Sequence, residues 1–349
     1  MSNPVLVEAL RGDTVESAHR GALVIVDAEG ATVLALGDAS RPVFPRSAVK
    51  LLQALPLVAS GAADRWQLSD AELALACASH GGEPPHVATA AGLLARLGLD
   101  DSVLECGAHW PGFEPATRAL ARSGAEPSAL HNNCSGKHSG LACLGCLLAG
   151  GADVRGFLSG YVQPQHPVMR EVSAALQAAT SHDLAHAPMG IDGCSIPTFA
   201  IPLEALALGF ARVASGVGLS AGHAVAARRL RQAIAAQPFM VAGSGRLDTD
   251  LMAHFGERLC CKVGAEGVYC AALPERGWGV AIKVDDGNNA RAAEVVLASV
   301  VQALLVRDEA DAAVLATRVA VTLRNWRGTV VGALRPASSL QQALATLAR

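Results

Sequence analysis

The chain has 349 residues and a mass of 35.7 kDa; 51% of the residues are hydrophobic, 17% are charged, and the formal net charge is -3 at pH 7. A chain of this size can bury a substantial core in one large domain or two smaller ones. The high hydrophobic fraction excludes a disordered protein. Near-neutral charge and only 4% aromatic residues argue against nucleic acid as a partner.

The basic residues are divided unevenly between arginine and lysine. Of the 28 basic residues only four are lysines, at Lys50, Lys137, Lys262 and Lys283. Arginine stays protonated at any accessible pH, whereas a lysine can lose its proton when it is buried or lies beside another cation. The rare lysines therefore indicate positions that require a deprotonatable amine, although codon bias alone would also produce the imbalance.

The first forty residues predict a β-hairpin, because apolar and polar positions alternate over residues 22–27 and 32–37. From Ser47 an apolar stripe at helical spacing predicts a helix that ends near Gly61. The next helix begins at residues 69–72, a capping-box pattern. Further helices are predicted over residues 85–97, 136–149, 167–180, 202–214 and 220–236.

Strand character returns only near the end of the chain. We predict strands over residues 259–273 and 278–284, an apolar helix over 290–306 and a last strand within 328–334. Strands at both ends with helices between them indicate an α/β fold of the α+β type. Its antiparallel sheet is built from the N- and C-terminal strands and flanked by helices, with a helical region inserted in the middle. We expect residues 1–349 to form a single domain.

Residues 1–10 lack the basic flank and apolar core of a signal peptide, and the longest apolar run is too short to span a bilayer. We therefore expect a soluble cytoplasmic protein that binds no membrane. Nine cysteines without a signal peptide favour free thiols or a metal site over disulfides. Cys143 and Cys146 lie among small apolar residues of a predicted helix, which favours a place in the core.

Ser47 and Lys50 are three residues apart at the start of a predicted helix, and so lie on one face of it. A serine hydroxyl becomes a strong nucleophile when a base takes its proton, and a neutral lysine can act as that base. Because the ordinary pKa of lysine is about 10.4, burial or a second cation would have to lower it. A capped helix with a lysine directed to solvent explains the same spacing equally well.

Residues 131–138 contain two histidines, a cysteine and a lysine immediately before an apolar helix. Together with the glycine-flanked residues 190–195, which expose Asp192 and Cys194, they fit a metal or substrate site. A polar loop that merely caps the following helix is the alternative. Ser79 and His80, beside a pair of glycines at a predicted helix end, are placed to face a cleft.

Five motifs occur in order along most of the chain, at residues 45–50, 77–83, 131–138, 190–194 and 262–267. On these motifs the sequence resembles the L-asparaginase II family, the rhizobial-type asparaginases. The resemblance implies a serine β-lactamase-like or glutaminase-like fold. It also implies an L-asparagine amidohydrolase that forms L-aspartate and ammonia, and a homodimer.

The resemblance further implies roles for individual residues. Two serine–lysine pairs, Ser47 with Lys50 and Ser79 with Lys262, would surround one site. A Zn²⁺ ion would be bound by three side chains, and three more would lie near the substrate, where Asp192 is the natural partner for its ammonium group. The zinc ligands are Cys134, Lys137 and Cys194, and the substrate residues are Arg46, His138 and Asp192.

From these roles we hypothesise that Ser47 attacks the side-chain amide and that Lys50 takes its proton. Ser79 and Lys262 would relay protons or hold Ser47 in position, and the exchanged assignment, with Ser79 as nucleophile, remains open. The metal would position the substrate or stiffen the loops that bind it. Two rivals are a glutaminase or β-lactam-recognising amidohydrolase, and a non-catalytic zinc- or thiol-based regulatory protein.

Overall fold

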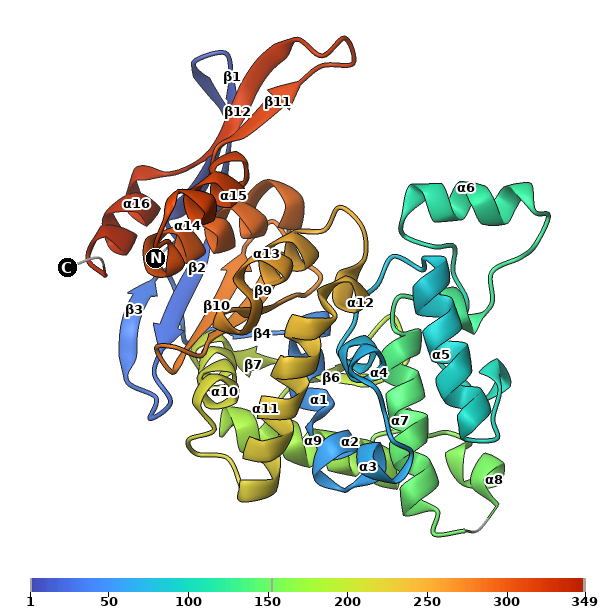
Figure 1. Ribbon diagram of the computed structural model, residues 1–349. Coiled ribbons are helices and arrows are strands. Elements are labelled where there is room, and N and C mark those ends of the chain that lie inside the picture. The colour runs from blue at the N-terminus through green and yellow to red at the C-terminus, as the bar shows by residue number, and fades with distance from the viewer. Residues whose placement is uncertain (1, 152, 348–349) are drawn as a thin grey trace.

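The computed structural model describes residues 2–151 and 153–347, and its largest element is a curled antiparallel sheet (Figure 1). One strand, β3 (Thr32–Leu36), pairs with β2 off the main path. The path itself runs through β11 (Val321–Arg324), β12 (Val330–Pro336), β1 (Val5–Arg11), β2 (Thr14–Val26), β10 (Trp278–Val284), β9 (Val268–Leu273) and β8 (Cys260–Val263). Strands from both ends of the chain share this sheet, which confirms the predicted mixed class and antiparallel sheet.

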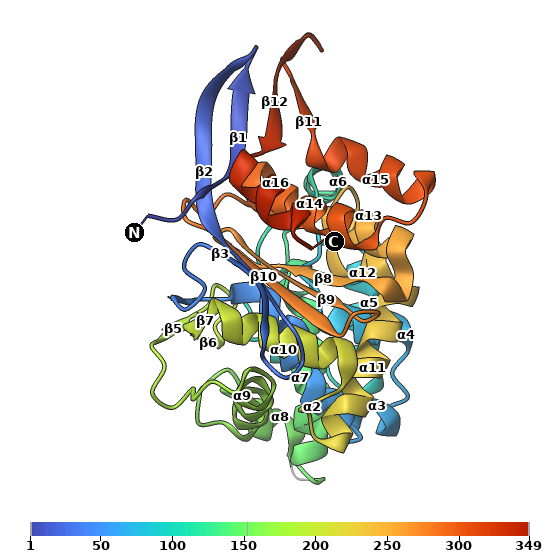
Figure 2. The ribbon, with the colours of Figure 1, turned by 90° about the vertical axis from the view of Figure 1, so that its left-hand side faces the viewer.

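Strand β2 joins the two halves of the sheet because its two ends pair with different strands. Its first part pairs with β1 as far as Arg20, and its second part pairs with β10 from Gly21 to Val26. The second part is almost wholly buried, whereas most of the first part is exposed. The exposed part projects from the body together with β1, β11 and β12, as Figure 2 shows.

Helix α10 (Leu203–Ser215) packs against β10, β9 and β2, while α14 (Glu294–Leu305) and α16 (Ser338–Ala345) pack against β1. Strand β10 comes so close to α10 that Gly279 faces the helix backbone. A Cβ atom at this position would lie 1.9 Å from the carbonyl oxygen of Ala207 and 2.3 Å from the nitrogen of Ala211. Glycine is required here by the close approach of two backbones.

Helix α7 (Ser135–Leu148) lies at the centre of the helical region and is buried from Ser135 to Cys146. No residue of this stretch is exposed to solvent, as expected for a helix surrounded by others. The helices in contact with it are α2 (Leu55–Ala59), α3 (Ala62–Arg65), α4 (Asp70–Ala76), α5 (Pro84–Arg96), α8 (Val154–Leu158) and α9 (Pro167–Thr180). This packing brings the loop after α4 beside the N-terminal end of α7.

The other elements lie around this frame. Two small sheets pair β4 (Pro42–Val43) with β7 (Ile201–Pro202) and β5 (Met189–Ile191) with β6 (Pro197–Phe199). Among the described residues, no helix is long and apolar enough to cross a membrane. The remaining helices are α1 (Lys50–Gln53), α6 (Glu114–Arg122), α11 (Ala221–Ala236), α12 (Pro238–Ala242), α13 (Leu247–Phe255) and α15 (Glu309–Val319).

The helix predicted from Ser47 to Gly61 is wrong as a single element. It forms a 3₁₀ turn at Arg46–Val49, followed by α1 and α2. Pro56 lies in the first turn of α2, where its missing N–H prevents the hydrogen bond that would continue α1. The break at Ala54 therefore separates α1, which begins with Lys50, from α2.

The single strand predicted over residues 259–273 is also wrong, because β8 and β9 are two strands joined by a tight turn. Glu266 and Gly267 in the turn have φ angles of +58° and +70°, so the chain reverses direction there. The apolar positions continue through the turn, and hydrophobic pattern alone does not reveal it. The capping box at residues 69–72 is confirmed at the start of α4.

We predict that Gly279→Ala lowers the free energy of unfolding by about 3 kcal/mol or more, because the added methyl group must push β10 away from α10. Gly92→Ala is the matched control, since a Cβ atom there meets nothing within 4 Å on the exposed side of α5. The control should gain about 0.5–1 kcal/mol from the higher helix propensity of alanine. Urea unfolding of both variants tests this, and equal effects would contradict the close contact.

Candidate active site

Two lysine amines from distant parts of the sequence meet at the hydroxyl of Ser79. The Nζ of Lys50, the first residue of α1, lies 2.9 Å from Ser79 Oγ, and the Nζ of Lys262, in β8, lies 3.1 Å from it. The two lysines are only 1% and 2% exposed. Because burial disfavours the charged form of an amine, the protonation of this pair decides what the site can do.

The position of Ser79 is set by the segments on either side of it. Helix α4 ends at Ala76, and the backbone N–H of Ser79 then donates to the carbonyl of Val241 at 2.8 Å. The next N–H, of His80, donates to the carbonyl of Asn133 at 3.2 Å. Ser79 is therefore fixed between the end of α12 and the loop that precedes α7.

The amine of Lys50 has three acceptors. Its Nζ lies 2.5 Å from the carbonyl oxygen of Ala78, 2.9 Å from Ser79 Oγ and 3.0 Å from the sulfur of Cys134. An ammonium group has three N–H donors. The three acceptors therefore fix the position of Lys50 Nζ on three sides.

Lys262 has the surroundings of a neutral amine. Burial lowers its pKa from the ordinary 10.5 to about 7; Asp248 partly opposes this, and Lys50 and Arg246 add to it. Its Nζ lies 2.7 Å from the carbonyl oxygen of Val263, which can take one N–H. The lone pair of a neutral amine can then accept the hydrogen of the Ser79 hydroxyl, so Lys262 can act as a base.

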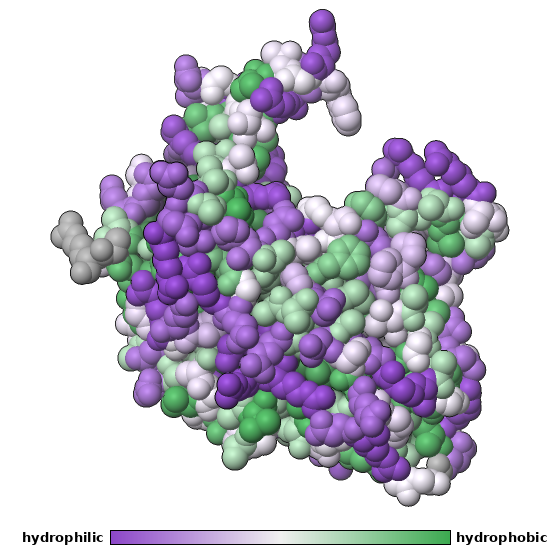
Figure 3. Space-filling view, viewed as in Figure 1, coloured by the Kyte–Doolittle hydropathy of each residue, from purple (hydrophilic) through white to green (hydrophobic). Residues whose placement is uncertain are grey.

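Both serines of the predicted pairs line one pocket of about 240 Å³. Phe113 at the start of α6 and Arg246 at the start of α13 border it, and Figure 3 shows the surface hollowed between these helices and the projecting strands. The lining residues are Ser47, Ser79, His80, Gly81, His109, Gly112, Phe113, Asn133, Ala242, Ser244, Arg246, Val263, Gly264, Ala265 and Asn289.

Ser47 is half-buried in this pocket, and within the described residues its hydroxyl makes no protein hydrogen bond. The amine of Lys50 turns toward Ser79 and Cys134, whose acceptors hold it. The structure therefore brings together Lys50, Ser79 and Lys262, with Ser47 beside them, in place of two separate serine–lysine pairs.

Arg46, directly before Ser47, has a φ angle of +52°, an uncommon backbone conformation for a residue with a side chain. Its Nε lies 2.8 Å from the Oδ1 of Asp192. Burial raises the pKa of Asp192, but the hydrogen bond and charge of Arg46 outweigh it and lower the pKa. Arg46 borders a second pocket, and neither member of this ion pair lines the first.

His138 lies away from the pocket. It is fully buried on α7, and its Nδ1 lies 2.5 Å from the hydroxyl of Tyr161. Burial, with the charges of Lys137 and Lys50, lowers the pKa of His138 well below its ordinary value, so the ring is neutral. In this arrangement the side chain supports the helix behind the site.

The three residues expected to bind zinc do lie together. The Nζ of Lys137 is 2.9 Å from the sulfur of Cys194. The sulfur of Cys134 accepts a hydrogen bond from the Nζ of Lys50 at 3.0 Å. The Cys194 thiol, with Lys50 and Lys137, holds the pKa of Cys134 well below its ordinary range against the effect of burial. The pKa of Cys194 is raised, mainly by its interaction with Cys134 and by burial. Of the two thiols, Cys134 is therefore the one that loses its proton more readily.

This donor set fits a zinc ion by its chemistry, because thiolates are preferred zinc ligands and a neutral amine can supply a third donor. In the ranges that the structure describes, no three side chains of histidine, cysteine, aspartate or glutamate form a metal-binding group. The third ligand would have to be Lys137. Burial lowers the pKa of its amine, but the neighbouring Cys194 and Cys134 raise it by more, so the net pKa is raised. A bound metal would have to displace the proton of that amine.

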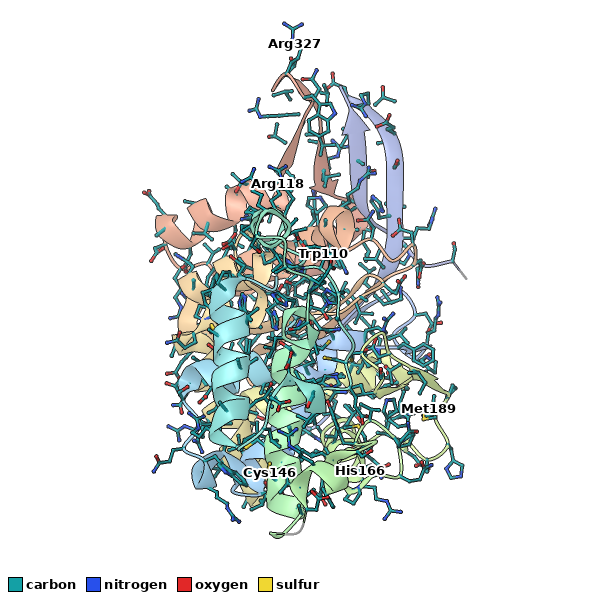
Figure 4. The ribbon with its side chains drawn as sticks, turned by 90° about the vertical axis from the view of Figure 1, so that its right-hand side faces the viewer. Trp110, Arg118, Cys146, His166, Met189 and Arg327 are labelled. Carbon is teal, nitrogen blue, oxygen red and sulfur yellow. The ribbon has the colours of Figure 1, made fainter. Side chains whose placement is uncertain are left out.

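The cysteines assigned to the core are buried, and Cys146 lies at the end of α7 opposite Cys134 (Figure 4). His86 is fully buried, and its ring accepts the N–H of Glu83 in a capping box at the start of α5. His86 stacks against both His80 and Phe239, with ring centres 4.8 Å and 4.7 Å apart. This stack packs behind one wall of the pocket.

Four residues that line the pocket could not be identified as site residues from the sequence. Three come from loops, and Asn289 begins a π-helical turn that leads into α14; none lies in a dense cluster of reactive residue types, so spacing does not single them out. Their shared feature is a place before a helix, which only the packing of that helix can direct toward the pocket. They are His109, Ser244, Arg246 and Asn289.

Buried amines around a hydroxyl, at the base of a small pocket, suit an enzyme that transfers an acyl group from a small molecule. The sequence profile described as L-asparaginase II matches residues 7–336, so the chain belongs to that family. The family identifies it as an asparaginase-type amidohydrolase acting on a small-molecule amide, and confirms the resemblance. A search of curated proteins found no match.

We predict that Lys262→Met is inactive. At pH 7 its free energy of unfolding should nevertheless be larger than that of the wild type. Between pH 7 and 10.5 the unfolded state binds the lysine proton and the folded state does not, so wild-type stability rises with pH. The variant should therefore be more stable by about 4 kcal/mol at pH 7, and the gain should disappear toward pH 10.5.

Urea unfolding at pH 7, 9 and 10.5 measures this difference. Lys283→Met is the comparison variant, because Lys283 lies in β10, which pairs with β9 and not with β8, and is only half-buried. Burial lowers the pKa of Lys283 too, so this variant should show the same pH dependence with a smaller gain. A gain for Lys262→Met that does not depend on pH would contradict the lowered pKa.

Proposed function

We propose that the protein hydrolyses the side-chain amide of L-asparagine to L-aspartate and ammonia through an ester with a serine. The observation that carries the proposal is the chain Lys50–Ser79–Lys262 at the base of the pocket that Ser47 also lines. Family membership supports an amide substrate, and a pocket of about 240 Å³ suits a small amino acid.

Ser47 is the nucleophile in this proposal. It is the more exposed of the two serines, since Ser79 is only 8% exposed and already lies between two amines. The hydroxyl of Ser47 makes no hydrogen bond to the described protein that would have to be broken before attack. Its attack on the amide carbon forms a tetrahedral intermediate, and loss of ammonia leaves a β-aspartyl ester.

The base is supplied by the lysine pair acting through Ser79. When Ser79 passes its proton to Lys262 and takes one from Lys50, the positive charge moves to Lys262 and Lys50 becomes neutral. Lys50, three residues from Ser47, can then accept the proton of the attacking hydroxyl. The reverse movement delivers a proton to the leaving nitrogen, and a water molecule attacking the ester restores Ser47 and releases L-aspartate.

The negative oxygen of the intermediate has two candidate donors. Ser47 and Ala265 both line the pocket, and in the described ranges neither backbone N–H donates to a protein group. Free N–H groups on rigid backbone stabilise such an oxygen strongly in a partly dehydrated site. Ala265 follows β8, so the strand that carries Lys262 also positions this donor.

Ser79 is the second candidate for the nucleophile, because both amines lie within hydrogen-bonding distance of its hydroxyl. In that case Lys262 would take its proton directly, and Ser47 would only contact the substrate. The chemistry and products would be the same, so activity measurements alone do not separate the two assignments.

We propose that Cys134, Lys137 and Cys194 hold a zinc ion. Zinc bound by thiolates and an amine would supply a Lewis acid that orients polar groups of the substrate. Lys50 contacts both Cys134 and Ser79, so the proposed metal site and the lysine pair share a residue. The serine and lysines provide the nucleophile and the base, and the metal therefore has a positioning role.

We predict that Ser47→Ala lowers the rate of ammonia release from L-asparagine by about 10⁴-fold, because the nucleophile is lost. Ser79→Ala should lower it by about 10²–10⁴-fold through loss of the proton relay. Rapid quenching followed by mass spectrometry should find the β-aspartyl ester on Ser47 in the wild type and in Ser79→Ala. An ester on Ser79 would exchange the two roles.

The same assay on a substrate panel separates the rival enzymes. Ammonia release from L-asparagine well above that from L-glutamine supports the proposal. Stable acylation by penicillin in place of amide hydrolysis would contradict it.

We predict that Cys194→Ser lowers the zinc content measured by elemental analysis and raises KM for L-asparagine more than it lowers kcat, because the metal positions substrate. Cys146→Ser, a buried thiol at the far end of α7, is the control and should keep both zinc and KM. Full zinc content in Cys194→Ser, or an unchanged KM after zinc removal, would refute this role.

A further inference from the structure

Arg246 is the permanently charged side chain in the lining of the pocket. No aspartate or glutamate of the described chain lines it, and the lysines Lys50 and Lys262 lie beneath its wall. Arg246 is half-buried, which strengthens its electrostatic interactions relative to those of a surface arginine.

The guanidinium of Arg246 is not neutralised by the acidic groups near it. Asp248 accepts hydrogen bonds from the N–H of Val263 at 2.9 Å and the hydroxyl of Tyr269 at 2.6 Å. Asp250 forms an ion pair with Arg318. Among the described residues, Arg246 forms no ion pair and no side-chain hydrogen bond, although Glu294 lies close enough to interact with it electrostatically.

The backbone that carries Arg246 is fixed on both sides. Before it, the N–H and hydroxyl of Ser244 donate to the carboxylate of Glu83 at 2.8 Å and 2.7 Å. Behind it, α13 is tied to the strand of Lys262, because Asp248 of α13 accepts from Val263. Arg246 is thus held in the pocket wall beneath which the two lysines lie, and there it can face a small ligand.

The other arginine near the site is already neutralised. Arg46 is bonded to Asp192 at 2.8 Å and lies outside the lining of the pocket. Of the two cations, Arg246 is the one with free donors facing the space that the substrate would fill. A planar guanidinium matches a carboxylate in a bidentate geometry that a lysine cannot reproduce.

We propose that Arg246 binds the α-carboxylate of the substrate and thereby selects free L-asparagine over substrates in which that carboxylate is blocked. The inference rests on the proposed function. The α-carboxylate is the part of L-asparagine that does not react, so its binding orients the side-chain amide toward Ser47. An asparagine within a peptide has no α-carboxylate and would lose this contact.

The test compares two substrates that differ only at the α-carboxylate, L-asparagine and its α-amide, L-aspartic acid diamide. Arg246→Gln should lower kcat/KM for L-asparagine by about 100-fold, as expected for loss of a partly buried charged contact. For the diamide the same variant should change the rate of side-chain amide hydrolysis by less than about threefold. Arg246→Lys should fall between the wild type and Arg246→Gln on L-asparagine.

The diamide separates carboxylate binding from an indirect role. If Arg246 acted only by lowering the pKa of Lys262, both substrates would lose activity equally, and the inference would be overturned. Arg41→Gln is the control for a general loss of positive charge, because Arg41 borders the second pocket and is paired with Asp285. It should leave the ratio between the substrates unchanged.

Wild-type activity is measured first. A wild type that releases no ammonia from L-asparagine would refute the proposed function. An active wild type whose Arg246→Gln variant keeps the same preference for L-asparagine over the diamide would refute the role of Arg246 alone. Thermal unfolding with and without L-aspartate adds a binding readout, in which the ligand should raise Tm in the wild type and not in a folded Arg246→Gln.

Discussion

The structure depends on holding two buried amines within hydrogen-bonding distance of one hydroxyl. Lys50 and Lys262 are 1% and 2% exposed, and two charged amines at this depth would repel each other. The arrangement is tolerable because the surroundings of the two amines differ. Three acceptors surround Lys50, whereas Lys262 has one carbonyl and the Ser79 hydroxyl, and burial lowers the pKa of Lys262 to about 7 so that it can release its proton.

Burying two amines side by side is unfavourable, and rigid packing around them holds them in place. The loop of Ser79 is fixed between α12 and the segment before α7, and β8 is tied to α13 through Asp248. Among the described residues, five non-glycine residues have positive φ, and three of these adjoin residues of the candidate site, namely Arg46, Ser195 and Glu266. Such strain persists only where the surrounding structure enforces it, and it is concentrated at functional sites.

Much of this could be predicted from the sequence. The antiparallel sheet built from both chain ends follows from strand patterns at residues 22–37 and 278–284, and the dense motif at 131–138 points to the cluster of Cys134 and Lys137. The capping box of α4 could also be predicted, because it depends only on two side chains three residues apart. These features depend on contacts between near neighbours or on long regular patterns.

The partners of each side chain could not be predicted in the same way. Ser47 and Lys50 suggest a pair by their spacing, but Lys50 turns to groups 28 to 84 residues away because those loops offer it three acceptors. Arg246 enters the pocket only through the packing of α13 on β8, and no local pattern records this. Long-range packing therefore decides the charge and orientation of the groups that the motifs supply.

The sheet topology also determines when the site can exist during synthesis. Ser79 emerges early, but β8, which carries Lys262, is made much later, and β1 must wait for β12 at the opposite end of the chain. Pairing across such sequence distances is slow and leaves strand edges exposed while the chain grows. The candidate active site can therefore form only after most of the polypeptide has left the ribosome, and chaperones that shield β1 and β2 during that interval would favour its assembly.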